Sequence, residues 1–437
     1  MGQQAVHTCL NHDRVEHYTI YFVLLSPYSV TFHSWRDSLL FGKTIVNTLR
    51  YSARSRSGRA LGPRLEDYLL ATSRNGNSNL IPKGAHTIRV SNVLKIGGGF
   101  WNDTFSMSLT YTDGGIPQQR NLVLKTYLEN IDPVLKAYIH DEDLRKCVRE
   151  FQALRSLGRI GFPVPEAYLC ECDSRFLGYP FVIMQKEEVV QKSINEIVDS
   201  FAATLAYLHN LKVAELGIDV LRPPEDEYAF ARRWPIHFKH YLNLESKHDK
   251  KLKKDFDFAI RWLNTNVSNN YCPQYCLAHG DYHPGNVCVT KDSRMIVLDW
   301  DSIEIGDPAY DVGYAYHFVK FFSDQKNPNS AERTAERFVS EYMRNFHGDI
   351  SRRLEFYKVV GILGTSIYYS SGLSNPICAY KYHRRKVVST FPFLSWPLIL
   401  LGFPFLRWPI VARRLGTEGD TDWLEYFENF LETTLKR

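Results

Sequence analysis

Long hydrophobic runs are missing from this sequence of 437 residues. No window reaches the roughly 18 uninterrupted apolar residues that a membrane-spanning helix needs. The mostly apolar stretch 18–32 follows acidic residues, Asp13 and Glu16, where a secretory signal carries basic ones. An internal repeat is also missing, which argues against solenoid and propeller architectures. We therefore expect a cytoplasmic globular protein.

Cysteine is sparse and scattered, with eight residues in the chain. Cys170 and Cys172 form one close pair and Cys272 and Cys276 another, but neither has a second pair at zinc-finger spacing. We expect reduced thiols rather than a disulfide framework. A strong charge imbalance is absent too, because 53 basic residues face 48 acidic ones. This balance does not indicate nucleic-acid binding, which concentrates positive charge on one face.

The chain does contain an ordered series of strand-like segments followed by helix-like ones. Residues with β-propensity, bounded by turn residues, occur at 87–94, 104–112, 121–127, 166–172 and 180–185, with one helical pattern inserted at 141–157. Apolar residues at helical spacing then recur at 193–211, 228–244, 252–267 and 331–346. Two short β-branched runs interrupt them, at 287–290 and 295–298. This order predicts an α+β fold with an antiparallel sheet first and a mostly helical part second.

The changes in composition divide the chain into four regions. We expect a partly flexible N-terminal extension at 1–61, the strand-rich part at 62–186, the helical part at 187–375 and a basic, apolar C-terminal extension at 376–437. Within the last region, the aromatic segment 391–411 contains four prolines, which disfavour a regular spanning helix. Two interpretations stay open for residues 390–415, namely packing on the helical part and peripheral contact with a membrane.

The densest group of polar residues lies in the second half, in three strings. His279–Asn286 reads H-G-D-Y-H-P-G-N, Asp299 follows an apolar strand-like run, and residues 306–311 read G-D-P-A-Y-D. Phosphoryl transfer needs a carboxylate to orient the attacking hydroxyl, and oxygen ligands to hold the magnesium that neutralises the phosphates. The spacing therefore predicts Asp281 as catalytic base, with Asn286 and Asp299 as metal ligands.

These strings resemble the catalytic and metal-binding segments of the aminoglycoside phosphotransferase and choline kinase family. The resemblance covers roughly residues 62–375 and implies a two-lobed, protein kinase-like fold that uses ATP and Mg²⁺. It assigns the base to Asp281 and the magnesium to Asn286 and Asp299. It also implies that His279 and Asp311 brace the loop, and that His209 is structural.

The family resemblance extends to the nucleotide clamp of the first half. The turn Gly97-Gly98-Gly99, followed by Asn102, resembles the family's phosphate-binding turn. Lys125 lies where the phosphate-binding lysine follows that turn, and Glu150 is its expected ion-pair partner, with Glu142 as the alternative. In the segment that links the two lobes, the resemblance implies that Met184 and Gln185 contact the adenine.

The acceptor is expected to be a small-molecule hydroxyl. Gly306 comes only seven positions after Asp299 and no A-P-E string follows, so the platform on which protein kinases bind peptides is missing. Three acidic residues, Asp301, Glu304 and Asp307, are either pocket carboxylates for a cationic substrate or surface and bracing groups. Two alternatives stay open: a membrane-associated kinase of a lipid or isoprenoid alcohol, and a non-catalytic pseudokinase that only binds nucleotide.

Overall fold

The computed structural model describes residues 58–75, 80–97, 102–127, 146–245, 250–323, 328–374, 426–427 and 429–435. The chain divides into two compact units, one of residues 58–367 with 427–437 and one of 1–57 with 368–426. The elements below belong to the first unit, although the last helix continues past residue 367. Most of the predicted N-terminal extension and the segment 391–411 lie outside the described residues. The four predicted region boundaries stay predictions.

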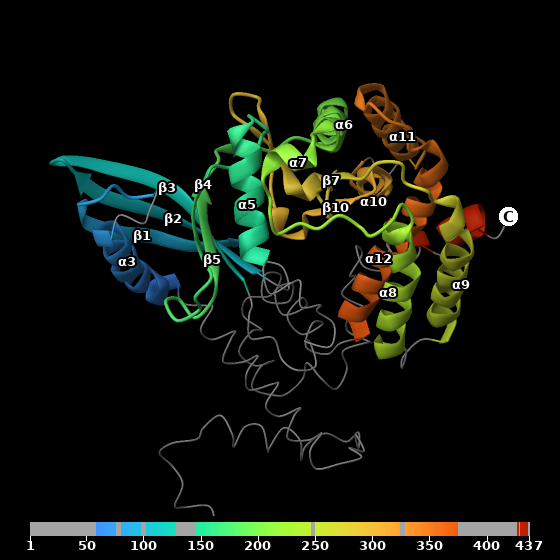
Figure 1. Ribbon diagram of the computed structural model, residues 1–437, viewed down its shortest axis with the longest axis horizontal. Helices are drawn as coiled ribbons and strands as arrows, with labels where there is room; N and C mark the ends of the chain where they lie inside the picture. The colour runs from blue at the N-terminus through green and yellow to red at the C-terminus, as the bar shows by residue number, and fades with distance from the viewer. Residues whose placement is uncertain are drawn as a thin grey trace, which may run out of the picture. The chain divides into compact units, whose positions relative to one another are not determined.

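A five-stranded antiparallel sheet forms the first part of this unit, in the order β1-β2-β3-β5-β4 (Figure 1). Three long strands come first, and two short ones follow: β1 (His86–Gly97), β2 (Asn102–Asp113), β3 (Ile116–Tyr127), β4 (Ala167–Glu171) and β5 (Phe181–Gln185). Turn residues with positive φ, Gly114 and Gly115, join β2 to β3. The predicted strands and their antiparallel arrangement are confirmed.

Successive side chains of a strand point to opposite faces of the sheet, and the two faces have different surroundings. Leu122 and Leu124 of β3 are fully buried in a core with Leu65 and Leu69 of helix α3 (Gly58–Asn75). Lys125 of β3 instead contacts helix α5 (Lys146–Arg159) on the opposite face. One face is therefore an apolar core, and the other carries buried polar groups.

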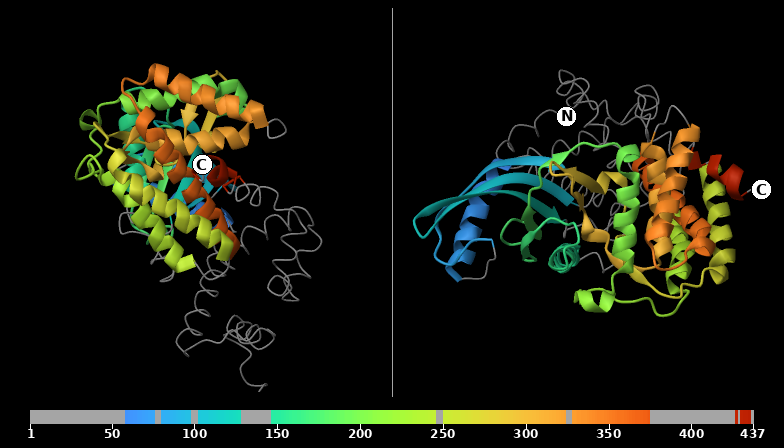
Figure 2. Two further views of the ribbon diagram at one scale, coloured as in Figure 1. Left: turned by 90° about the vertical axis from the view of Figure 1, so that its right-hand side faces the viewer. Right: turned by 90° about the horizontal axis from the view of Figure 1, so that it is seen from above.

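The second part of the unit is mostly helical, and Figure 2 shows it at the other end from the sheet. Its helices are α6 (Ile194–Asn210), α7 (Val213–Leu216), α8 (Ala229–Glu245), α9 (Lys250–Asn266), α10 (Pro308–Phe322), α11 (Pro328–Asn345) and α12 (Ser351–Ser374). Four short strands lie between α9 and α10, and one precedes α6. Of these, β7 (Cys276–Ala278) pairs with β10 (Glu304–Gly306), and β8 (Val287–Thr290) pairs with β9 (Met295–Val297) and with the earlier β6 (Val189–Val190). The α+β fold class is confirmed.

Two glycines let helices α10 and α12 approach each other closely. A Cβ atom on Gly313 would lie 2.5 Å from the backbone carbon of Tyr357, and one on Gly361 would lie 2.9 Å from the Cα of Tyr314. Both distances are below any normal Cβ contact, so the two backbones touch directly. This crossing fixes the face of α10 that carries Tyr314.

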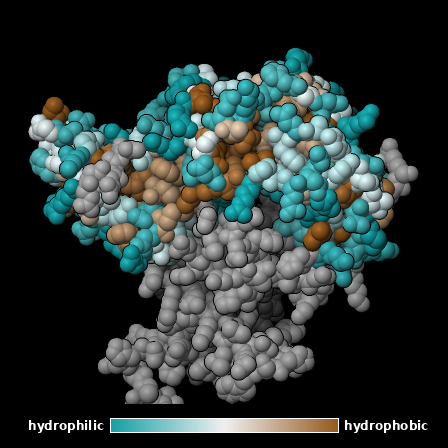
Figure 3. Space-filling model, viewed as in Figure 1, coloured by the Kyte–Doolittle hydropathy of each residue, from teal (hydrophilic) through white to brown (hydrophobic). Residues whose placement is uncertain are grey.

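Hydrophobic surface gathers in the middle of one face of this unit, between the sheet and the helices, while hydrophilic residues cover its outer parts (Figure 3). The C-terminal residues close the helical part, since the ring of Phe427 lies 5.1 Å from that of Phe256 on α9. None of the helices in the described ranges combines the length and apolar character that a membrane crossing requires.

Candidate active site

The loop after β7 is held by hydrogen bonds from its backbone to one buried carboxylate. The N–H of His279 donates to Asp311 Oδ2 at 2.6 Å, and that of Gly280 donates to Asp311 Oδ1 at 3.0 Å. Asp311 lies in the first turn of α10 and is fully buried. It also contacts His209 Nε2 at 3.1 Å. The contacts of Asp311 and His209 are those of bracing groups.

Gly280 has no room for a side chain. Its φ of +82° lies in the left-handed region, and a Cβ there would lie 2.1 Å from the carbonyl oxygen of Ser302. The loop therefore needs glycine immediately before Asp281. The Asp281 side chain that follows this turn contacts Tyr314 of α10 and Asn286 of its own loop.

His279 ties the two loops of the site together. Its Nε2 donates to the carbonyl oxygen of Leu298 at 3.0 Å, and its Nδ1 accepts from the N–H of Asp281 at 3.2 Å. Burial lowers the pKa of His279, although Asp311 and Asp281 oppose this effect. A neutral ring with its proton on Nε2 satisfies both hydrogen bonds. His279 is thus a positioning residue between the loop of Asp281 and the strand end at Leu298.

The carboxylate of Asp281 is one-third exposed and is held on both oxygens. Tyr314 Oη donates to Oδ1 at 2.6 Å, and Asn286 Nδ2 donates to Oδ2 at 3.0 Å. His283 Nε2 lies 3.7 Å from Oδ1. Burial raises the pKa of Asp281, but the contacts from His283 and Tyr314 outweigh it and leave the pKa below its usual value. Asp281 is therefore ionised at neutral pH.

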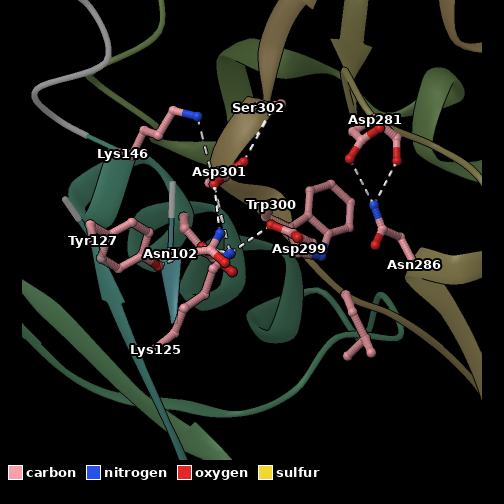
Figure 4. Close-up of polar contacts among 12 residues, drawn as sticks. Asn102, Lys125, Tyr127, Lys146, Asp281, Asn286, Asp299, Trp300, Asp301 and Ser302 are labelled. Carbon is pink, nitrogen blue, oxygen red and sulfur yellow. Dashed lines mark hydrogen bonds and ion pairs between the residues drawn. The ribbon is translucent and has the colours of Figure 1, made fainter. Parts of the chain in front are cut away.

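Asn286 and Asp299 lie at adjoining ends of the β8–β9 hairpin. Val287 pairs with Val297, and the N–H of Leu298 donates to the carbonyl oxygen of Asn286 at 2.8 Å. Asp299 follows directly with a φ of +62°, an uncommon value for a residue with a side chain. Figure 4 shows the amide nitrogen of Asn286 turned toward Asp281. The positive φ of Asp299 is a form of backbone strain that is typical of functional sites.

Lys125 joins acidic residues from both parts of the unit. Its Nζ lies 2.6 Å from Glu150 Oε2 on α5 and 2.6 Å from Asp299 Oδ1 after β9. The Lys125 side chain is only 6% exposed. Burial lowers its pKa, but Asp299, Glu150 and Asp301 outweigh this effect, so the pKa is raised and the ammonium stays charged. The expected ion pair of Lys125 with Glu150 is present in the structure. Glu142, the alternative partner, lies outside the described residues.

Asp301 belongs to the same cluster, whereas the sequence suggested it only as a pocket carboxylate for a cationic substrate or as a surface or bracing group. Its Oδ2 lies 3.8 Å from Lys125 Nζ and 3.7 Å from Lys146 Nζ, and accepts from Asn102 Nδ2 at 3.3 Å (Figure 4). Burial raises the pKa of Asp301, but the two lysines outweigh it and lower the pKa to about 2. In the sequence, the D-W-D string after β9 is the pattern from which Asp301 could have been predicted. No sequence pattern predicts the contact of Lys146, because that contact depends on where α5 packs.

Carboxylate oxygens of Glu150, Asp299 and Asp301 lie within 4.8 Å of one another. Three acidic groups so close together need cations, and Lys125 and Lys146 supply two. The cluster therefore combines carboxylate ligands with positive charge at the boundary between sheet and helices.

The predicted nucleotide clamp is described only in part. Gly97 ends β1 and Asn102 begins β2, whereas Gly98 and Gly99 lie outside the described residues. The buried side chain of Asn102 binds Asp301. The phosphate-binding role of this turn stays a prediction.

The predicted adenine-binding segment lies at the end of β5. Met184 is buried, and Gln185 Oε1 accepts from Tyr168 Oη at 2.8 Å. The N–H of Gln185 donates to the carbonyl oxygen of Glu166 at 2.8 Å. Because this donor is already used, adenine recognition there would rely on carbonyl oxygens or on other donors. The adenine contact of Met184 and Gln185 stays a prediction.

Comparisons with known proteins give relatives of two kinds. Mouse acyl-CoA dehydrogenase family member 10 is 23% identical over 284 residues, which is 57% of this chain and 25% of that protein. Rat acyl-CoA dehydrogenase family member 11 is 29% identical over 182 residues, 39% of this chain and 22% of the relative. This chain thus spans about a quarter of the length of the curated relatives it matches.

Among solved structures, choline kinase LicA from Streptococcus pneumoniae matches with 15% identity and a TM-score of 0.43, covering 69% of this chain and 94% of that one. The phosphotransferase enzyme family, APH, matches residues 117–355. That range holds Lys125, Glu150, Asp281, Asn286 and Asp299. Because the family match covers more than half of the sequence, this chain belongs to the phosphotransferase enzyme family.

Proposed function

We propose that this phosphotransferase moves the γ-phosphoryl group of ATP to a hydroxyl of a small molecule. The observation that carries the proposal is the placement of Lys125 between Glu150 and Asp299, beside the partly exposed Asp281 loop. A buried lysine held by a helix glutamate on one side and a strand-end aspartate on the other is suited to binding phosphates. Purely structural ion pairs have no need of an ionised, accessible carboxylate nearby.

Nucleotide binding would exchange one partner of Lys125. Glu150 is nearly fully buried and also accepts from Tyr127 Oη at 2.5 Å, so it can keep Lys125 in place. Asp299 is one-third exposed and can turn toward a metal ion. Lys125 would then bind phosphate oxygens in place of the Asp299 carboxylate.

The residues at the end of the β8–β9 hairpin fit a magnesium ion. Asp299 offers a carboxylate, and Asn286 offers an amide oxygen because its nitrogen donates to Asp281. Hard cations such as Mg²⁺ prefer these oxygen ligands. A bound ion would neutralise charge on the transferred phosphate.

Asp281 would act on the acceptor alcohol. Its ionised carboxylate accepts a hydrogen bond from the hydroxyl, the hydroxyl oxygen bonds to the γ-phosphorus, and the bond from that phosphorus to the bridging oxygen of ADP breaks. Asp281 takes the proton as the new ester forms, and ADP leaves with the electron pair of the broken bond. A low pKa suits this task, because the loose transition state demands little early proton transfer.

The acceptor is a small molecule because little chain is available to bind a peptide. Only residues 300–307 separate Asp299 from the start of α10, and they form a short 3₁₀ turn and strand β10. The segment on which protein kinases seat a peptide is much longer.

The three acidic residues considered for a cationic substrate are engaged inside the protein. Glu304 binds Arg233 through two hydrogen bonds of 2.6 Å, and buried Asp307 binds Arg353 at 2.8 Å. Asp301 faces lysines. The bracing interpretation of these residues is thus favoured, and they give no acidic pocket for a polycationic sugar.

A row of aromatic side chains begins at Asp281 instead. Tyr314 binds the carboxylate, its ring lies 6.2 Å from that of Tyr310, and Tyr310 stacks on Trp234 at 4.8 Å. This row favours an acceptor with apolar or ring surface next to its hydroxyl.

Asp281→Asn tests the proposed role directly. Removing the base should lower turnover by about two to four orders of magnitude while Mg-ATP affinity changes little, because Asp281 does not contact the lysine cluster. Asp199→Asn, an exposed aspartate on α6, is the control and should keep full turnover. Unchanged turnover in Asp281→Asn would refute the assigned base.

An acceptor panel tests the substrate class. ATP consumption should be stimulated by neutral or ring-bearing alcohols more than by polycationic aminoglycosides. Stimulation by aminoglycosides alone would contradict the inferred acceptor class, but it would still support the proposed phosphotransfer activity. ATP binding without stimulation by any alcohol would instead favour a pseudokinase.

A further inference from the structure

Three cysteines converge where the start of α5 meets the end of β4. Cys147 lies in the first turn of α5, Cys170 in β4, and Cys172 one residue after β4. The Sγ atoms of Cys147 and Cys172 are 3.7 Å apart, and all three Sγ atoms lie within 4.8 Å of one another. None of the three is in a disulfide.

The backbone explains this convergence. Cys170 and Cys172 are two positions apart, so an extended strand end places them on the same face. Glu171 between them turns to the other face, where its Oε2 accepts from Tyr68 Oη of α3 at 2.8 Å. Helix α5 covers the cysteine face, and Cys170 Sγ donates to the carbonyl oxygen of Cys147 at 3.6 Å.

The sulfur spacing matches that of a metal site more closely than that of a disulfide. Tetrahedral zinc with Zn–S bonds of about 2.3 Å places two thiolate sulfurs about 3.8 Å apart, and the Cys147–Cys172 separation is 3.7 Å. A disulfide requires about 2.05 Å between the two sulfurs. The third sulfur needs a shift of about 1 Å at most to complete a trigonal set of ligands at this spacing.

The three cysteines differ in burial, which would leave one side of a bound ion open to solvent. Cys147 is buried, Cys170 is half-buried and Cys172 is exposed. A metal ion on these three sulfurs would keep its fourth coordination position toward solvent, where water can bind.

We propose that Cys147, Cys170 and Cys172 form a binding site for one thiophilic cation, Zn²⁺, with the fourth ligand supplied by solvent. The thiols lose their protons as the Zn–S bonds form. The bound ion ties the beginning of α5 to the end of β4. Glu150, which binds Lys125, lies less than one turn further along α5, so the ion stabilises the helix that positions it.

Metal titration of the full-length, reduced protein tests this site. Zn²⁺ is titrated against a chromophoric chelator in excess Mg²⁺, and Co²⁺ is used in parallel because its thiolate charge-transfer absorption reports sulfur ligands. We expect one equivalent of tightly bound metal per chain. Cys170→Ser and Cys172→Ser should each weaken binding at least about tenfold, with Cys288→Ser as the control that keeps the site. Cys147 is buried, so the test does not depend on changing it.

Thermal unfolding supplies the second readout. Zn²⁺ should raise the melting temperature of the wild type and of Cys288→Ser. It should raise the melting temperature of Cys172→Ser much less. Absence of stoichiometric metal, or binding that survives both Cys170→Ser and Cys172→Ser, would overturn the proposal. A Cys147–Cys172 disulfide formed under mild peroxide, in a protein that binds no Zn²⁺, would replace the metal site by a redox pair.

Discussion

At the scale of single residues, Lys125 is under a strong electrostatic constraint. It is buried between Glu150 and Asp299 with short contacts to both. Burial raises the pKa of Glu150, although Lys125 opposes this effect. An uncompensated charge would therefore be left inside the protein if the lysine were removed.

Lys125→Met should lower the free energy of unfolding at neutral pH by about 3–5 kcal/mol, the usual effect of breaking a buried ion pair. Without Lys125, the pKa of Glu150 rises further above its unfolded value. The folded state then binds a proton more strongly, so the loss should shrink as pH falls from about 8 to about 5. Denaturant unfolding at several pH values measures this, with exposed Lys192→Met as a control that should change little. A loss independent of pH would contradict the assignment to Glu150.

Asp281 offers a second test at this scale. His283 and Tyr314 hold its pKa below the usual value, and under the proposed function turnover needs the ionised form. Tyr314→Phe should raise that pKa because it removes a hydrogen bond to the ionised carboxylate, so the loss of turnover at acidic pH should move to higher pH. The pH profile of kcat measures this shift, and Tyr207→Phe on the exposed side of α6 is the control. If the acidic side of the pH profile of kcat does not move, Tyr314 does not lower the pKa of Asp281.

At the scale of elements, the crossing of α10 and α12 connects packing to the site. Gly361→Ala would place a Cβ 2.9 Å from the Cα of Tyr314. It should lower stability by about 1–3 kcal/mol through overpacking and lower turnover by displacing Tyr314. Gly364 on the same helix has only the ring of Phe238 at 3.5 Å, an ordinary contact.

Gly364→Ala is thus the matched control, and should be neutral or more stable by up to about 1 kcal/mol because alanine favours helix. Thermal and denaturant unfolding measure the stability of Gly361→Ala and Gly364→Ala relative to the wild type. Equal effects of the two substitutions would show that the backbones can separate without cost.

Sequence patterns predicted elements well where only one face is buried. The stripe of α6 and the strands of the sheet were found because apolar residues recur at the right spacing. The bounds of α10 were not found, since most of its residues are buried all around and leave no stripe. The motif strings predicted roles for Asp281, Asn286 and Asp299, whereas the contacts of Lys146, Tyr314 and the cysteine cluster depend on packing between distant segments.

At the scale of the whole molecule, the sheet and the helical part meet at polar contacts. Lys125 reaches Asp299 and Asn102 reaches Asp301, each crossing from a strand of the sheet to the loop after β9. A ligand that replaces or reinforces these contacts should stabilise both parts together. Under the proposed function, Mg-ATP is such a ligand.

Mg-ATP at about 100 times its dissociation constant should stabilise the wild type by about 2.7 kcal/mol. Asp299→Ala should lose most of this gain because it removes the proposed metal ligand. Asp292→Ala, in the exposed turn of the same hairpin, should keep it. Differential scanning calorimetry with and without Mg-ATP measures the effect. The same gain in both variants would contradict the role of Asp299.

The glycine crossing also constrains how related sequences can diverge. At Gly313 and Gly361 the obstacle to a larger residue is the backbone of the other helix, so no change of a neighbouring side chain can make room. A relative with a larger residue at either position must hold α12 farther from α10. We therefore expect substitutions at these two positions to appear only in lineages that have also rebuilt the contacts of Tyr314, the tyrosine that binds Asp281.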